Sequence, residues 1–187
     1  MLTILDQHLR QALWIFGPGL LLGSFWWIRN LTVYGWPDVM GLQAHDAAVT
    51  GQPRTADWVA NRGLLPFLRE ALHTTFRSFW GQFGWMGVVL DRRIYVAARI
   101  LSGLMAWGAF WKLREGIKQG FEPRHRDALL LLGSGALITL ALFIFYNLTF
   151  VQHQGRYLYP ALPALALTGS LGLRHLLKRR IAVLTAG

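Results

Sequence analysis

The residues best suited to bind a ligand are an arginine and its polar neighbours, set between two long apolar runs. Arg156 follows residues 128–155, which carry no charge if His153 is neutral, and precedes residues 157–173, which carry none. A cation at the edge of the hydrocarbon layer is costly unless it meets a carboxylate, a phosphate or water. A guanidinium can bind phosphate through two parallel hydrogen bonds. Arg156 is therefore the first candidate for a binding residue.

A second group of basic residues lies upstream on one stripe of a predicted helix. Arg69, His73 and Arg77 recur at intervals of four, which places them on one helical face. If this face lies near Arg156, the two groups form a pocket for a lipid-linked phosphate. The candidate residues of that pocket are Arg156, Gln154, Tyr157, His153, Arg69, His73 and Arg77.

A structural role for the same residues is the alternative. Arg156 would then pair with lipid headgroups or with Asp91, and Tyr157 and Tyr159 would be ordinary aromatic residues of the membrane interface. The residues alone leave both interpretations open.

The sequence contains none of the common catalytic motifs that would identify a reaction. The chain has no cysteine, and it lacks a nucleotide-binding loop, a paired-histidine metal motif and a Gly-x-Ser-x-Gly elbow. His45 and Asp46 could hold a metal or act as an acid–base pair, but neighbouring polar residues in a loop are usually only solvated. The residues therefore identify no catalytic group, no metal site and no cofactor.

Four apolar stretches predict an all-α membrane protein with four transmembrane helices in a single domain, residues 1–187. About 20 apolar residues cross a bilayer. Arg99 lies near one end of the second stretch, where its side chain can reach the membrane surface. The predicted spans are about 11–28, 94–111, 128–149 and 160–177.

Charge predicts the orientation of these spans. The formal net charge of +10 is concentrated at span ends, above all in residues 112–126 and 174–180. Short basic loops stay in the cytoplasm, so both termini are expected there, in the bacterial inner (plasma) membrane. Basic residues spread over span ends favour contact with anionic lipid headgroups and argue against nucleic-acid binding.

The outer segment, residues 30–92, is predicted to begin as an irregular loop over about 30–60, because it is rich in turn residues. From Leu64 the apolar residues recur at helical spacing, opposite the basic stripe. This pattern predicts an amphipathic interfacial helix over about 64–80. The aromatic patch 79–85 follows it.

Three segments carry a resemblance. They are Phe25-Trp26-Trp27-Ile28-Arg29-Asn30 with Tyr34-Gly35-x-Pro37, Ser78-Phe79-Trp80-Gly81-Gln82-Phe83-Gly84-Trp85-Met86, and Gln154-Gly155-Arg156-Tyr157-Leu158-Tyr159-Pro160-Ala161-Leu162-Pro163-Ala164. Over residues 20–175 the chain resembles the C-terminal half of bacterial polytopic proteins allied to the GT-C glycosyltransferases. That group includes the protein mannosyltransferase and aminoarabinose transferase families and many uncharacterised membrane proteins.

The resemblance implies a transfer of sugar from a polyprenyl-phosphate carrier at the outer face, with Arg156 near the carrier phosphate and Gln154 and Tyr157 beside it. A divalent metal is implied only by this family analogy. Family members carry their catalytic carboxylate in the first outer loop, upstream of the part that this chain resembles, so Asp38 is not assigned that role.

The chain is therefore interpreted as a fragment or truncated relative that retains the carrier-lipid side of the site and is not competent as an enzyme alone. The sugar, the acceptor, any partner with the catalytic residues and the oligomeric state stay open. The rival interpretation is a non-catalytic membrane subunit that docks a membrane-protein partner through its aromatic outer loop and interfacial helix.

Overall fold

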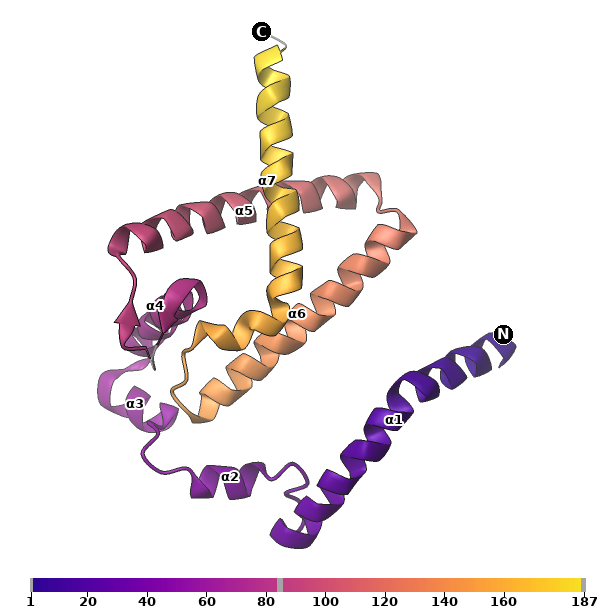
Figure 1. The fold of residues 1–187 in the computed structure, drawn as a ribbon, viewed down its shortest axis with the longest axis vertical. Helices are drawn as coiled ribbons and strands as arrows, with labels where there is room; N and C mark the ends of the chain where they lie inside the picture. The colour runs from indigo at the N-terminus through magenta and orange to yellow at the C-terminus, as the bar shows by residue number, and fades with distance from the viewer. Residues whose placement is uncertain (1, 84–85, 186–187) are drawn as a thin grey trace. The chain divides into compact units, whose positions relative to one another are not determined.

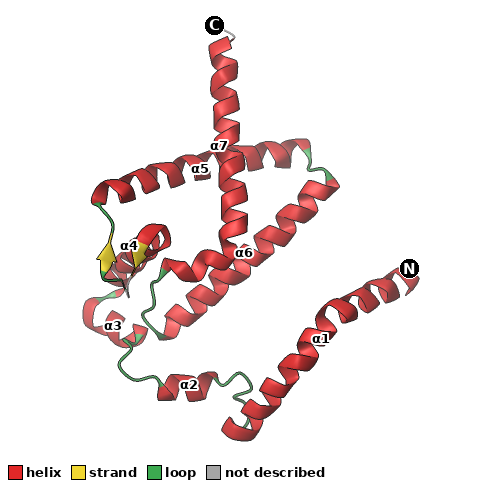
Figure 2. Ribbon diagram, in the orientation of Figure 1, coloured by secondary structure: helices red, strands yellow, loops and turns green. Residues whose placement is uncertain are grey.

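The computed structural model describes residues 2–83 and 86–185, and these residues are mostly helical (Figure 2). Among them, three helical stretches are long and apolar enough to cross a membrane: Asp6–Tyr34, Arg92–Gln119 and His125–Thr149. They coincide with three of the predicted spans. The fourth predicted span, residues 160–177, is not among them; its first residues belong to a 3₁₀ helix and the remainder begins a separate α-helix.

The chain divides into two compact units, Met1–Gln52 and Pro53–Gly187. The first unit contains helix α1 (Leu2–Tyr34) and the short helix α2 (Leu42–Ala48). Asn30, which is fully buried, donates from Nδ2 to the carbonyl of Val39 at 3.0 Å and so closes the connecting turn onto the end of α1. The Asp38 carboxylate accepts hydrogen bonds from backbone amides in the first turn of α2. The expectation of an irregular loop over 30–60 is thus wrong where α2 forms.

The second unit contains the remaining elements (Figure 1). They are α3 (Thr55–Arg62), α4 (Leu64–Gly81), β1 (Gln82–Phe83), β2 (Val88–Val89), α5 (Arg92–Gln119), α6 (Pro123–Thr149), the 3₁₀ helix η1 (Gly155–Ala161) and α7 (Leu162–Thr185). Helix α3 also lies partly in the segment expected to be irregular, whereas α4 matches the helix predicted over 64–80.

Local chemistry sets several of these boundaries. Gly63 and Gly120 adopt positive φ angles of 89° and 80°, which side chains disfavour, and they separate α3 from α4 and end α5. Asp91 caps α5 by accepting from the amide of Arg93 at 2.7 Å. Pro123 occupies the first turn of α6, where its missing amide proton is not needed.

Helices α5 and α7 cross near their middles through two buried glycines (Figure 1). A Cβ atom on Gly108 would collide with the backbone of Gly172, and one on Gly172 would lie 2.5 Å from the amide nitrogen of Ala109. Small residues at such a crossing let two helix backbones approach closely, as they do in membranes. A second contact joins His175 Nδ1 to Glu115 Oε2 at 3.6 Å.

The aromatic patch begins in the last turn of α4 and continues into β1, which pairs antiparallel with β2 so that Phe83 lies opposite Val88. We call this β1–β2 pair between α4 and α5 the hairpin. The buried Tyr95 ties this hairpin to the start of α5. Its hydroxyl donates to the carbonyl of Gly81 at 2.7 Å and accepts from the amide of Leu90 at 3.1 Å. The two ends of the hairpin are therefore fixed by one side chain.

Candidate functional site

The turn between α6 and η1 is bound tightly to α4. The amide of Gly155 donates to Ser78 Oγ at 2.7 Å, and Thr75 Oγ1 donates to the carbonyl of His153 at 3.3 Å. Gly155 is buried so close to α4 that a Cβ atom there would lie against the carbonyl of Thr75 and 2.5 Å from the amide of Phe79. Glycine is therefore required here for packing.

The preceding residues of the turn are held by α3 and the strand-like segment before it. Phe150 is fully buried, and Arg54 pairs with it in an antiparallel bridge while its guanidinium carbon lies 4.6 Å from the Phe150 ring centroid. The amide of Val151 donates to the carbonyl of Pro53 at 2.9 Å, and Thr55 Oγ1 donates to the carbonyl of Asn147 at 2.8 Å. Both sides of the turn are thus fixed.

Arg156 is exposed directly after the buried Gly155. Its guanidinium carbon lies 5.5 Å from the centroid of the Tyr157 ring, a distance typical of a cation–π contact. The neighbouring Gln154 does not turn toward it: its side-chain amide donates to Gln152 Oε1 at 2.8 Å. The structure therefore pairs Arg156 with Tyr157 and pairs Gln154 with Gln152.

His153 is buried against α4. Its ring lies 4.8 Å from the Phe67 ring, edge to face, and its Nε2 atom has no hydrogen-bond partner among the described residues. Burial lowers the pKa of His153 below its ordinary value, and the nearby Glu70 carboxylate offsets only part of that effect. The structure therefore places His153 against Phe67 in the interior of the turn, and a binding role for it stays a prediction.

The basic stripe of α4 divides in two. Arg69 and His73 are exposed and make no hydrogen bond or ion pair with any residue that the structure describes. Arg77 is half-buried and turns toward α5, where its guanidinium carbon lies 4.6 Å from the Tyr95 ring centroid. The stripe therefore presents Arg69 and His73 at the surface and turns Arg77 toward α5, and the convergence of these residues on Arg156 stays a prediction.

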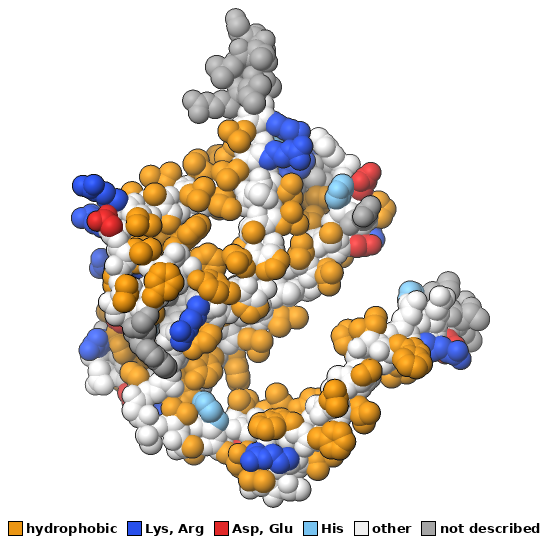
Figure 3. All heavy atoms as spheres, viewed as in Figure 1, with side chains coloured by type: hydrophobic (Ala, Val, Ile, Leu, Met, Phe, Trp, Pro, Cys, Tyr) orange, Lys and Arg blue, Asp and Glu red, His pale blue; other side chains and the backbone are white. Residues whose placement is uncertain are grey.

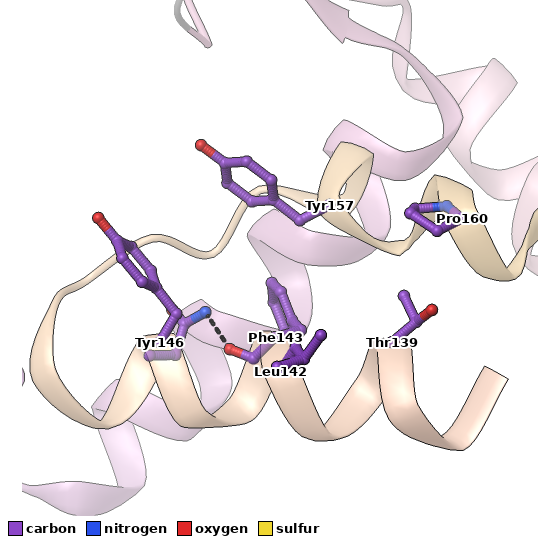
Figure 4. Close-up of a pocket in the computed structure, with 7 residues that line it drawn as sticks. Thr139, Leu142, Phe143, Tyr146, Tyr157 and Pro160 are labelled. Carbon is purple, nitrogen blue, oxygen red and sulfur yellow. Dashed lines mark hydrogen bonds between the residues drawn. The ribbon is translucent and has the colours of Figure 1, made fainter. Parts of the chain in front are cut away.

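An apolar groove of about 340 Å³ lies between α6 and η1 (Figure 4). Figure 4 shows the Tyr146 and Tyr157 side chains extending toward one end of the view and Thr139 lying toward the other. The lining residues are Thr139, Leu142, Phe143, Tyr146, Asn147, Tyr157 and Pro160. Of these, Tyr157 alone belongs to the binding residues predicted from the sequence. The five lining residues of α6 recur at i, i+3, i+4, i+7 and i+8, which places them on one helical face. This spacing does not stand out in the sequence, because α6 is apolar on all its faces.

Two acids discussed above, Asp38 and Asp46, lie in different surroundings. Asp38 accepts hydrogen bonds from amides of α2, and Asp46 lies beside His45. Burial acts to raise the pKa of Asp38, but hydrogen bonds from the backbone amides of Ala44, Gln43 and their neighbours outweigh it and leave the pKa below its ordinary value. The carboxylate therefore stays ionised where it accepts from amides in the first turn of α2. His45 Nδ1 lies 3.1 Å from Asp46 Oδ1 at the exposed surface. In the described parts of the chain, no group of three His, Cys, Asp or Glu residues is placed to hold a metal ion.

The fold and the site define a helical protein that has, in its described residues, three helices of membrane-spanning length and an exposed arginine next to a residue that lines an apolar groove. Comparison with known protein families, curated proteins and solved structures gives no match. The likeness to GT-C glycosyltransferases therefore stays a prediction that rests on the motifs quoted above.

Proposed function

We propose that this chain is an integral membrane protein that binds a lipid-linked phosphate through Arg156. The observation that carries the proposal is the placement of Arg156, exposed between the buried Gly155 and the groove-lining Tyr157. A guanidinium on so firmly held a turn loses little freedom when it binds, which favours two-point recognition of a phosphate. Hydrophobic side chains cover much of α5 and α6 (Figure 3), as expected of helices that meet lipid.

In this proposal the natural ligand is a polyprenyl phosphate that carries a sugar, and the chain supplies the carrier side of a GT-C-like site. The resemblance of the Gly155-Arg156-Tyr157 segment supports the choice of lipid. The reaction also needs a base that activates the acceptor hydroxyl. Neither the motifs nor the contacts of the turn assign an acid to that task, so the catalytic carboxylate would come from elsewhere.

The proposed topology has four spans, with α4 on the outer surface and both ends of the chain in the cytoplasm. Its support is the basic character of residues 112–126 and 174–180. Helix α7 crosses α5 steeply in Figure 1. If both helices span the bilayer, both must tilt, and tilts of up to about 40° are found in membrane proteins.

The test is a comparison of two lipids that differ only in the phosphate. Purified protein in phosphatidylcholine nanodiscs should bind polyprenyl phosphate in preference to polyprenol, which has the same chain and no charge. Arg156→Gln should weaken binding of the phosphate about tenfold to a hundredfold, because a hydrogen bond to a charged group contributes about 1.5–3 kcal/mol. Arg156→Lys should fall between, since lysine keeps the charge without the planar fork.

Arg114 offers a matched control. It is exposed, and its guanidinium carbon lies 5.0 Å from the Trp111 ring centroid, so it resembles Arg156 in charge and stacking while lying in α5. Arg114→Gln should bind polyprenyl phosphate as the wild type does. Equal affinity of Arg156→Gln and wild type, or an equal loss in both variants, would refute the proposal.

The second candidate is a non-catalytic subunit that docks a membrane partner through the aromatic hairpin. Its support is the exposure of Phe83 and Val88, which are 59% and 58% accessible at the hairpin. Trp80 contributes less, because it packs on Phe76 and Phe79, and Trp85 lies outside the described residues. Absence of phosphate-dependent binding in the assay above would favour this candidate.

A further inference from the structure

The groove between α6 and η1 has a composition that suits an amphiphile. Its lining is mostly apolar, and the Tyr146 and Tyr157 side chains extend toward the same end of it (Figure 4). Leu142 and Pro160 face the groove from its two walls.

Thr139 lies toward the other end of the groove, but its hydroxyl donates to the Gly135 carbonyl at 2.9 Å, and Asn147 Oδ1 accepts from the Gln152 amide at 3.0 Å. The groove therefore offers mostly apolar surface to an apolar chain, with the two tyrosines at one end.

We infer that this groove holds the hydrocarbon chain of the lipid whose phosphate binds Arg156. The inference rests on the proposed function and adds a second subsite to it. Tyr157 links the two subsites, because one face of its ring lies 5.5 Å from the Arg156 guanidinium carbon while the same side chain lines the groove. A phosphate at Arg156 and the chain attached to it can therefore occupy neighbouring positions.

The structure favours a lipid chain over a protein helix as the occupant. The groove is about 340 Å³ in volume, near the lower end of small-molecule sites, whereas a helix with its side chains is about 10 Å wide. The α6 stretch His125–Thr149 is the most apolar of the three candidate spans, and none of its most apolar window is buried by the rest of the protein. The groove therefore opens from a helix face that meets lipid chains in a bilayer.

Affinity alone cannot test this subsite. A chain that leaves the bilayer for the groove gains no hydrophobic free energy, since it moves between two apolar surroundings. Contact with the phosphate makes binding selective for this lipid, and the groove determines where its hydrocarbon chain lies. The appropriate readout is where the chain lies on the protein.

The experiment uses polyprenyl phosphate with a diazirine in the part of its chain nearest the phosphate, photolysed on the wild-type protein in phosphatidylcholine nanodiscs. Labelled residues are located by peptide mass spectrometry. We expect labels at Leu142, Phe143 and Tyr157, displaced by unlabelled polyprenyl phosphate and much less by polyprenol.

Two tryptophan variants of α6 give the matched comparison. Leu142→Trp fills the groove, and Leu137→Trp places the same ring on the opposite face of the helix; the two leucines are 63% and 67% exposed, so the fold should tolerate both changes. We expect loss of the groove labels in Leu142→Trp and their retention in Leu137→Trp.

The outcomes separate this inference from the function on which it rests. Two results would overturn the inference even if binding still depended on Arg156. The first is labels spread evenly around α6 and unchanged by Leu142→Trp. The second is no labels in the groove because another helix fills it. Equal labelling by a phosphatidylcholine with a diazirine in its chain would also overturn it. Loss of the Arg156 dependence in the affinity assay would remove the proposed function itself.

Discussion

Replacing Gly155 with alanine should loosen the turn that presents Arg156. The added Cβ would lie against the Thr75 carbonyl, 2.5 Å from the Phe79 amide nitrogen and 2.6 Å from the Phe79 Cβ. Two of these three atoms are backbone atoms of α4 and cannot rotate away, so the turn itself must move. The movement would also lengthen the 2.7 Å hydrogen bond from the Gly155 amide to Ser78 Oγ.

The expected loss of unfolding free energy is about 2–4 kcal/mol, because overpacking costs about 1–3 kcal/mol and the hydrogen bond contributes about 0.5–1.5 kcal/mol. Denaturant unfolding in detergent, followed by the fluorescence of the nine tryptophans, measures this loss. Gly155→Ala should also weaken binding of polyprenyl phosphate, since Arg156 would no longer be held in one place.

Gly133→Ala is the matched control. Gly133 lies inside α6, and a Cβ atom added to it would have no neighbouring atom within 4 Å. Alanine there should leave stability unchanged or raise it by up to about 1 kcal/mol through helix propensity. A Gly155→Ala protein as stable as the wild type would refute the close packing of this turn on α4.

Tyr95→Phe should lower the free energy of unfolding by about 1–3 kcal/mol, because the Gly81 carbonyl and the Leu90 amide both lose their hydrogen bond to the buried hydroxyl. The same unfolding assay measures this loss. A loss below about 0.5 kcal/mol would contradict the hydrogen bonds of Tyr95. His153 should make the stability depend on pH, because its pKa is lowered in the folded protein and the unfolded chain therefore binds the proton more readily. The free energy of unfolding should fall as the pH drops below about 6.5, and the loss should be complete below the pKa of the folded state. Unfolding curves from about pH 7 to about pH 5 should be flatter for His153→Phe than for wild type, and equal slopes would refute the assignment.

Features that depend on local sequence can be predicted, and contacts between distant segments cannot. The helix predicted over 64–80 is found as α4, because its spacing of apolar residues and the glycines at its ends are local signals. Helix α2 escapes prediction, because it is only seven residues long and is stabilised by the carboxylate of Asp38 before it. The hydrogen bond from Gly155 to Ser78 joins residues 77 positions apart, and no local pattern reveals it.

The candidate site shows the same limit in its side chains. Helical spacing correctly puts Arg77 on the same stripe as Arg69 and His73, but spacing does not say which neighbour a long side chain will contact. The half-buried Arg77 contacts the Tyr95 ring, to which no sequence pattern connects it. His153 is a candidate on its polarity alone, and its burial against Phe67 depends on a contact between distant parts of the chain.

The period of a 3₁₀ helix explains why consecutive residues of the Gly-Arg-Tyr segment have different roles. With three residues per turn, successive side chains point about 120° apart, and residues three apart share a face. Gly155, Leu158 and Ala161 lie on the less exposed face, and Tyr157 and Pro160 both line the groove. Arg156 falls on the third face, with Tyr159, whose hydroxyl donates to the Phe79 carbonyl at 3.1 Å.

This arrangement constrains how the segment can change. An ordinary α-helix would advance about 100° per residue and would carry Pro160 away from the face of Tyr157 over one turn. The 3₁₀ geometry therefore keeps the packing face on α4 and the groove face toward α6 over the whole of η1, while Arg156 stays exposed between them. A residue inserted between Gly155 and Tyr157 would rotate the groove face onto α4, so we expect the segment to tolerate substitution at Arg156 far better than insertion beside it.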